Sequence, residues 1–237
     1  MLRKKGRGES RGLFSDDDVA ADHITIMKLL YTPIKGYVHT VEAVLNYTGL
    51  REAVLPVATK PFEADNPLVG INPLGKVPTL VLDSGEYLAG GPVIYEYLDS
   101  LHRRRRLFPA KGPQRWTTLR QAWMADGLFD TFVLLIVESW RPKDQQRADY
   151  IERCMAKIIA MLDQIERDVA GYGRLDIGQM RTVGALQFLR LKMPQVGQAA
   201  IGLDATFDPL ATRPALAAWY KPLVRKKIFR EPLIRLD

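Results

Sequence analysis

Residues 71–99 read INPLGKVPTLVLDSGEYLAGGPVIYEYLD, and this stretch decides the fold. It holds two short apolar runs, VPTLVL and EYLA, joined by the turn residues DSG, which predicts two strands in a hairpin. Two glycines and a proline follow. After them, apolar residues recur at helical spacing from Pro92 to Leu101. The stretch therefore predicts a strand hairpin that ends at a glycine corner and turns directly into a helix.

The glycine corner has two interpretations. Pro92 suits the first turn of a helix, because its missing N–H would have no partner there in any case. Gly91 then stands at the helix cap, where bare N–H groups and the positive end of the helix dipole attract a carboxylate or a phosphate. Glycine also lets a ligand approach the backbone closely. The simpler interpretation is that Gly90, Gly91 and Pro92 only turn the chain into the helix.

Strand and helix patterns alternate through the first part of the chain, up to the linker. The order is a strand, a helix that stops at Gly49, a second strand, an irregular segment with two Asn-Pro steps, and then the hairpin and its helix. This order predicts a small α/β domain. The expected strands cover residues 27–31, 52–57, 77–82 and 86–89, the helices cover 37–49 and 92–101, and the domain covers 27–101.

Beyond this domain the strand patterns stop. Residues 102–113 hold two prolines and a glycine among charged residues, as a linker does. Residues 114–237 then repeat apolar positions at steps of three and four, which predicts an all-helical domain. The expected helices cover residues 114–139, 145–170, 177–193 and 214–226.

Composition narrows the class of protein. The chain has 237 residues, 47% of them hydrophobic, and a formal net charge of +7. No apolar run approaches the roughly 20 residues needed to cross a bilayer. The basic clusters at 103–106 and 225–227 have no aromatic residues between them, which argues against nucleic-acid binding. Residues 1–26 lack the apolar stretch of a secretion signal, so we expect a disordered lead-in, with Met27 as an alternative start.

Cysteine and histidine usage adds two expectations. The single cysteine, Cys154, excludes an intramolecular disulfide and indicates a reducing cytoplasm. No histidine or cysteine pair has the spacing of metal ligands, so we expect no metal site. We expect His39 to pack or to lie on the surface, because the sequence shows no carboxylate at a spacing that would orient it.

Residues 71–99 resemble the glutathione-binding half of the cytosolic glutathione transferases, and the resemblance extends from Met27 onward. It implies an N-terminal thioredoxin-like domain followed by an all-helical C-terminal domain. In that family the proline matching Pro78 is cis, and the residue before it, here Val77, pairs like a strand with the cysteinyl part of glutathione. The residue matching Lys76 contacts the glycine carboxylate. The resemblance therefore implies that Lys76, Val77 and Pro78 bind glutathione as a co-substrate.

The helical half also resembles the family. Residues 124–130 are similar to its first long helix, residues 215–220 to its last helix, and LDIGQM to the start of its buried helix. In this last segment Asp176 and Gln179 have the spacing of a capping box, in which each side chain bonds the other residue's backbone N–H.

The glycine corner departs from the family pattern. Most relatives place an acidic residue and a serine where Gly90 and Gly91 stand, and these hold the γ-glutamyl group of glutathione. Here only the backbone of the two glycines remains to bind the carboxylate. Losing one hydroxyl contact to a charged group costs about 1.5–3 kcal/mol, or roughly ten- to a hundredfold in affinity. We therefore expect weak glutathione binding, and we expect Gly91→Ser to tighten it if the geometry of the site is that of the family.

The thiol-activating residue also departs from the pattern. The family stabilises the glutathione thiolate with a hydroxyl or a cysteine near the end of the first strand. Lys35 stands where many relatives have serine, and its ammonium favours a thiolate by charge. Tyr31 matches the tyrosine of another branch, and Thr32 is a weaker candidate. The alternative is that Tyr31 points into the core and Lys35 is a solvated loop residue.

The resemblance implies an acceptor pocket for a small hydrophobic electrophile. Tyr37, Trp123 and Asp126 are the expected lining residues, and Trp140 is expected on a helix beside the cleft; the alternative places both tryptophans in the core. The predicted function is glutathione transfer to the electrophile by a homodimer. One alternative is a binding or regulatory protein that kept the fold and lost catalysis. Another is an enzyme that binds a different anion at the start of the helix.

Overall fold

The computed structural model describes residues 26–32, 37–63 and 65–230. The predictions on Lys35 and on the lead-in up to residue 25 lie outside these residues.

A four-stranded sheet forms the centre of the N-terminal half. In the order β2-β1-β3-β4, β1 is parallel to β2, while the β1/β3 and β3/β4 pairs are antiparallel. Leu29 lies opposite Leu80 in the register, and both side chains are fully buried. The strands are β1 (Met27–Tyr31), β2 (Val54–Ala58), β3 (Thr79–Val81) and β4 (Tyr87–Ala89).

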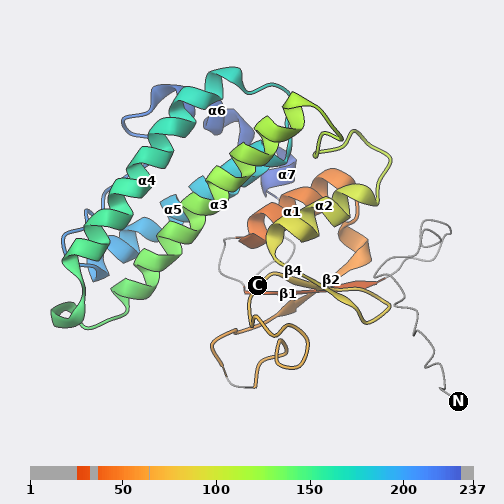
Figure 1. Cartoon of the computed structure of the whole chain (residues 1–237), viewed down its shortest axis with the longest axis horizontal. Helices are drawn as coiled ribbons and strands as arrows, with labels where there is room; N and C mark the ends of the chain where they lie inside the picture. The colour runs from red at the N-terminus through yellow and green to blue at the C-terminus, as the bar shows by residue number, and fades with distance from the viewer. Residues whose placement is uncertain (1–25, 33–36, 64, 231–237) are drawn as a thin grey trace, which may run out of the picture.

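Two helices cover one face of this sheet, between it and the long helices of the second half (Figure 1). They are α1 (Tyr37–Thr48) and α2 (Gly91–Ser100), and α1 turns Val41, Val44 and Leu45 into the core. Between β2 and β3 the described residues form turns rather than a helix. The predicted thioredoxin-like arrangement is confirmed.

The C-terminal half is helical, as predicted, and α5 lies at its centre against α3 (Figure 1). Most residues of α5 are buried, including Met180, Leu186 and Met193. The helices are α3 (Pro113–Ser139), α4 (Ala148–Asp168), α5 (Ile177–Ala199), α6 (Pro214–Leu223) and α7 (Lys227–Arg230). Short 3₁₀ turns lie at Arg51–Ala53, Lys143–Gln145 and Val169–Gly171.

Two C-terminal helix ends differ most from the prediction. α5 continues through Pro194 to Ala199, because the buried Met193 and Val196 keep that turn packed on the core although the proline donates no hydrogen bond. The predicted helix over 214–226 ends at Leu223, one residue after Pro222, and a separate short helix follows.

Two predicted side-chain roles also need correction. Asp176 caps α5 by accepting from the Gln179 N–H at 3.0 Å, but the Gln179 side chain bonds the carbonyls of Gly173 and Arg174, so the capping box forms on one side only. His39 does have a carboxylate within reach, because Glu42, three residues later on α1, lies 3.6 Å from its ring nitrogen.

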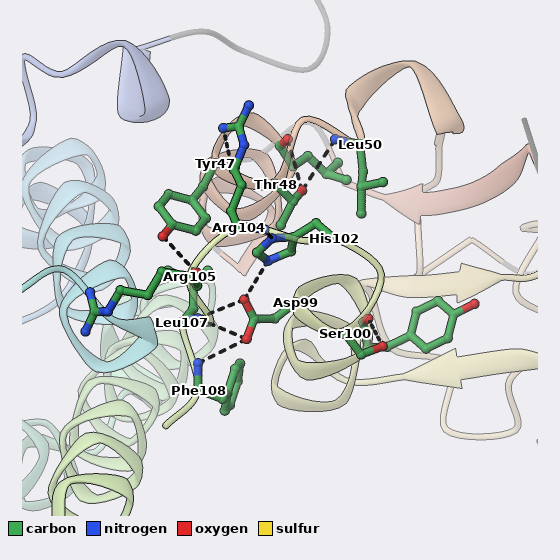
Figure 2. Close-up of polar contacts among 12 residues, drawn as sticks. Tyr47, Thr48, Leu50, Asp99, Ser100, His102, Arg104, Arg105, Leu107 and Phe108 are labelled. Atoms are coloured by element: carbon green, nitrogen blue, oxygen red, sulfur yellow. Dashed lines mark hydrogen bonds and ion pairs between the residues drawn. The ribbon is translucent and has the colours of Figure 1, made fainter. Parts of the chain in front are cut away.

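One buried carboxylate holds the segment between α2 and α3 at its start and at its middle. Figure 2 shows Asp99, on α2, pointing at His102 and at the backbone of Leu107 and Phe108. The Leu107 N–H donates to it at 2.8 Å, the Phe108 N–H at 3.1 Å, and the His102 Nε2 lies 2.9 Å away. Because Asp99 is 2% exposed, these partners replace its water.

The described residues lack two kinds of feature. None of the described helices is long and apolar enough to cross a membrane. Among the same residues there is no cluster of three or more side chains that could ligate a metal ion.

Candidate functional site

The cis-proline turn and the start of α2 lie side by side. The Val77–Pro78 peptide bond is cis, as the resemblance implies. The Gly90 N–H donates to the carbonyl of Pro78 at 3.2 Å. This bond joins the two segments that the sequence analysis assigned to one ligand.

Two buried polar residues hold the turn that presents Lys76. Asn72 is 2% exposed, and its amide donates to the Lys76 carbonyl at 3.1 Å and to the Thr79 hydroxyl at 2.9 Å. The Thr79 hydroxyl donates to the same carbonyl at 2.9 Å. With its backbone fixed in this way, the Lys76 side chain is exposed beside the cis bond. Sequence reasoning did not single out Asn72; its Asn-Pro step was the available signal.

The start of α2 presents backbone donors only. Gly90, at φ 91°, is the N-cap and supplies no side-chain hydrogen bond. The first helical bond runs from the Ile94 N–H to the Gly90 carbonyl at 3.2 Å. The N–H groups of Gly91 and Val93 therefore have no partner within the helix, and Pro92 has no N–H. The sequence predicts an anion site at this corner, and backbone N–H groups are the donors that such a site would use.

The structure gives a reason against the expected benefit of Gly91→Ser. A Cβ built on Gly91 would lie 2.7 Å from the Cζ of Tyr95, nearer still to its hydroxyl oxygen, and 2.9 Å from a ring carbon of Tyr37. Contacts this short require the neighbours to move. The room that a serine needs is taken by two tyrosines, so the expectation of tighter binding is withdrawn.

Behind the corner, the arginine of a buried ion pair in the helical half contacts residues of the N-terminal half. Arg181, on α5, is 1% exposed and pairs with Asp126 of α3. Its guanidinium lies 4.4 Å from the ring centroid of Tyr37, on α1, and donates to the hydroxyls of Thr40 and Tyr95 at 3.0 and 3.4 Å. The sequence patterns gave no sign of this arginine.

Burial dominates the electrostatics of this cluster. It raises the pKa of Asp126, and the charge of Arg181 works in the opposite direction. Burial also raises the pKa of both Tyr37 and Tyr95 far above the usual range, so both phenols keep their protons at neutral pH. Asp126, a predicted pocket residue, is 5% exposed and points into this cluster.

Of the three predicted thiol-activating residues, the structure describes two. Tyr31 is 5% exposed within the core, and burial, helped by the charge of Glu42, raises its pKa. The Thr32 hydroxyl donates to the Thr59 carbonyl at 3.2 Å. Tyr37 follows the third candidate by two residues, and its hydroxyl donates to Asp130 of α3 at 2.9 Å.

The two tryptophans predicted to lie beside the cleft are on the surface. Trp123 is 75% exposed and Trp140 is 62% exposed, so the interpretation that places them in the core is wrong. The ring of Trp140, beside the end of α3, lies 5.8 Å from the ring of Phe62, which comes from the turns after β2 and is 86% exposed. Leu134 and Val137 of α3 are also about half exposed.

Sequence comparison identifies relatives of the N-terminal half. Residues 36–101 match the family "Glutathione S-transferase, N-terminal domain". A GST-like protein of Escherichia coli (strain K12), YibF, is 34% identical over 106 residues, which cover 45% of this chain and 52% of YibF. The chain therefore matches about half the length of this curated relative.

Solved structures match most of both chains. A glutathione transferase family member from Pseudomonas fluorescens Pf-5, with bound glutathione, has a TM-score of 0.75 and 29% identity, over 86% of this chain and 96% of that one. A glutathione S-transferase from Methylobacillus flagellatus KT, with glutathione bound, has a TM-score of 0.76 and 26% identity, over the same shares.

Proposed function

This chain belongs to the glutathione S-transferase family, and from that premise we propose that it binds glutathione between the cis-proline turn and the start of α2. The cysteinyl part lies along the backbone of Val77, and the glycine carboxylate meets Lys76. The γ-glutamyl carboxylate meets the N–H groups at Gly91 and Val93. The observation that carries this proposal is the hydrogen bond from Gly90 to Pro78, since it makes one continuous backbone surface of the two segments.

The proposed reaction is attack of the glutathione thiolate on a hydrophobic electrophile. Tyr31 is packed in the core and the Thr32 hydroxyl already has an acceptor, which leaves Lys35 as the residue that favours the thiolate. An ammonium near a thiol lowers the thiol pKa and so increases the nucleophilic form.

We propose that the hydrophobic electrophile binds at the exposed apolar surface of α3. Trp123, Leu134 and Val137 leave apolar area in water, and the Phe62–Trp140 contact extends it to the turns after β2. Tyr37 closes the same side through its bond to Asp130. Such a surface suits an apolar acceptor.

A second candidate function is glutathione binding without turnover. The buried Tyr31 and the absence of a side-chain donor at the described start of α2 favour it, because both weaken the usual machinery of transfer. We also place the protein in the cytoplasm, on the strength of its single buried cysteine.

Calorimetric titration with glutathione tests the binding proposal. We expect a single site with weak, roughly millimolar affinity, because backbone donors alone meet the γ-glutamyl carboxylate. S-methylglutathione should bind similarly but give no product with an aromatic chloride, which separates binding from thiol chemistry. An absence of heat with both ligands would rule out the proposed site. Binding with no turnover of several electrophiles would favour the second function.

A further inference from the structure

Tyr95 lies one helical turn after Gly91 and is held in place on two sides. Its side chain is 1% exposed. The hydroxyl donates to the Tyr37 carbonyl at 3.2 Å and accepts from Nη1 of Arg181 at 3.4 Å. Moving the hydroxyl would break hydrogen bonds between buried groups, which is costly. The phenol therefore cannot swing aside as a surface tyrosine does.

The phenol occupies the space beside the Cα of Gly91. A Cβ at position 91 would meet its Cζ at 2.7 Å and the Tyr37 ring at 2.9 Å. Separations below about 3 Å are not tolerated without movement in a close-packed interior. By contrast, a Cβ on Gly90 would meet nothing within 4 Å, although the φ of 91° disfavours a side chain there.

The partners of Tyr95 come from the start of α1 and from the helical half of the chain. Tyr37 is the first residue of α1 and follows the segment that contains Lys35. Arg181 and its partner Asp126 come from α5 and α3. A displacement of Tyr95 would therefore be transmitted to the start of α1 and to the helical half, as well as to the start of α2.

We propose that Tyr95 is a positioning residue of the glutathione site, whose hydroxyl fills the place of a side chain at residue 91 and fixes the start of α2 against α1 and α5. The inference rests on the proposed function. It predicts that glycine is required at position 91 as long as Tyr95 is present, and that a serine there weakens binding.

Calorimetry on four proteins tests the coupling: the wild type, Gly91→Ser, Tyr95→Leu and the double variant. We expect Gly91→Ser to weaken glutathione binding roughly tenfold or more beside Tyr95, and by less than roughly threefold beside a leucine, which leaves room for the serine. Gly173→Ser is the matched control, because a Cβ there meets nothing within 4 Å and the site is distant in sequence. It should bind as the wild type does.

The outcomes separate this inference from the proposed function. No heat with the wild type defeats the proposed function. If the wild type binds and Gly91→Ser lowers the affinity equally beside Tyr95 and in the Tyr95→Leu background, the role of Tyr95 is overturned. Tighter binding by the Gly91→Ser single variant would overturn it as well. Urea unfolding of the four proteins measures the coupling between residues 91 and 95 in the absence of ligand. If Gly91→Ser does not fold, Tyr95→Phe decides, since unchanged glutathione affinity in that variant would overturn the positioning role.

Discussion

The proposed thiol activation depends on single residues near the end of β1. We expect Lys35→Ala to lower kcat/KM roughly tenfold, because it removes the positive charge proposed to favour the thiolate. Tyr31→Phe should stay within roughly twofold of the wild type, since its buried hydroxyl lies in the core. The measurement is turnover with an aromatic chloride, together with the ultraviolet absorbance of the bound thiolate as the pH is varied.

Each of these two variants is the control for the other. Lys35→Ala should raise the pH at which the bound thiol ionises, and Tyr31→Phe should not change it. A loss with Tyr31→Phe alone would return thiol activation to the tyrosine, and unchanged rates in both variants would exclude both residues.

At this scale the sequence predicted backbone features better than side-chain partners. The cis bond before Pro78 and the helix start at the glycine corner followed from local pattern and resemblance. The effect of a side chain at position 91 could not be predicted in the same way. It depends on Tyr95, one helical turn later, and on Arg181, far along the chain. Contacts between distant segments leave no local spacing to read, so the sequence does not show how little room a serine has at this position.

At the scale of secondary-structure elements, Asp99 stabilises the connection from α2 to α3. Asp99→Ala would leave two buried N–H groups and His102 without their acceptor (Figure 2). We expect a loss of about 2–4 kcal/mol in the free energy of unfolding, measured by urea denaturation. Glu63→Ala is the control, because its pair with Lys60 is exposed and contributes little. Equal losses in the two variants would refute the role of Asp99.

Element types were easier to predict than element ends. The sheet and the long helices follow from periodicity, because a buried face must recur at the period of its element. The end of α5 did not, since burial of Met193 and Val196 outweighs the helix-breaking tendency of Pro194. The composition of residues 102–113 predicts a linker. It gives no sign that the Asp99 carboxylate of α2 accepts hydrogen bonds from Leu107 and Phe108 and so holds this segment in place.

At the scale of the whole molecule, one apolar area on α2 and β4 is left open to solvent. Val93 is 51% exposed, and it borders a hollow of about 310 Å³ lined also by Leu88 and Tyr97. Trp116, 69% exposed, follows Arg115, whose guanidinium lies 3.1 Å from Glu96 of α2. Exposed apolar side chains beside a hollow are typical of an interaction surface. We propose that a second copy of the chain covers it.

Val93→Glu tests this homodimer, because it places a charge in the hollow that the partner would have to bury unpaired. We expect light scattering to report a dimer for the wild type and a shift of at least roughly tenfold toward monomer for the variant. Ile159→Glu, at an exposed apolar position of α4, should leave the dimer intact. A wild type that stays monomeric at high concentration would contradict the proposal. A dimer that persists in Val93→Glu would instead mean that the two copies meet elsewhere on the surface, since a buried unpaired carboxylate is too costly to be accommodated within a packed interface.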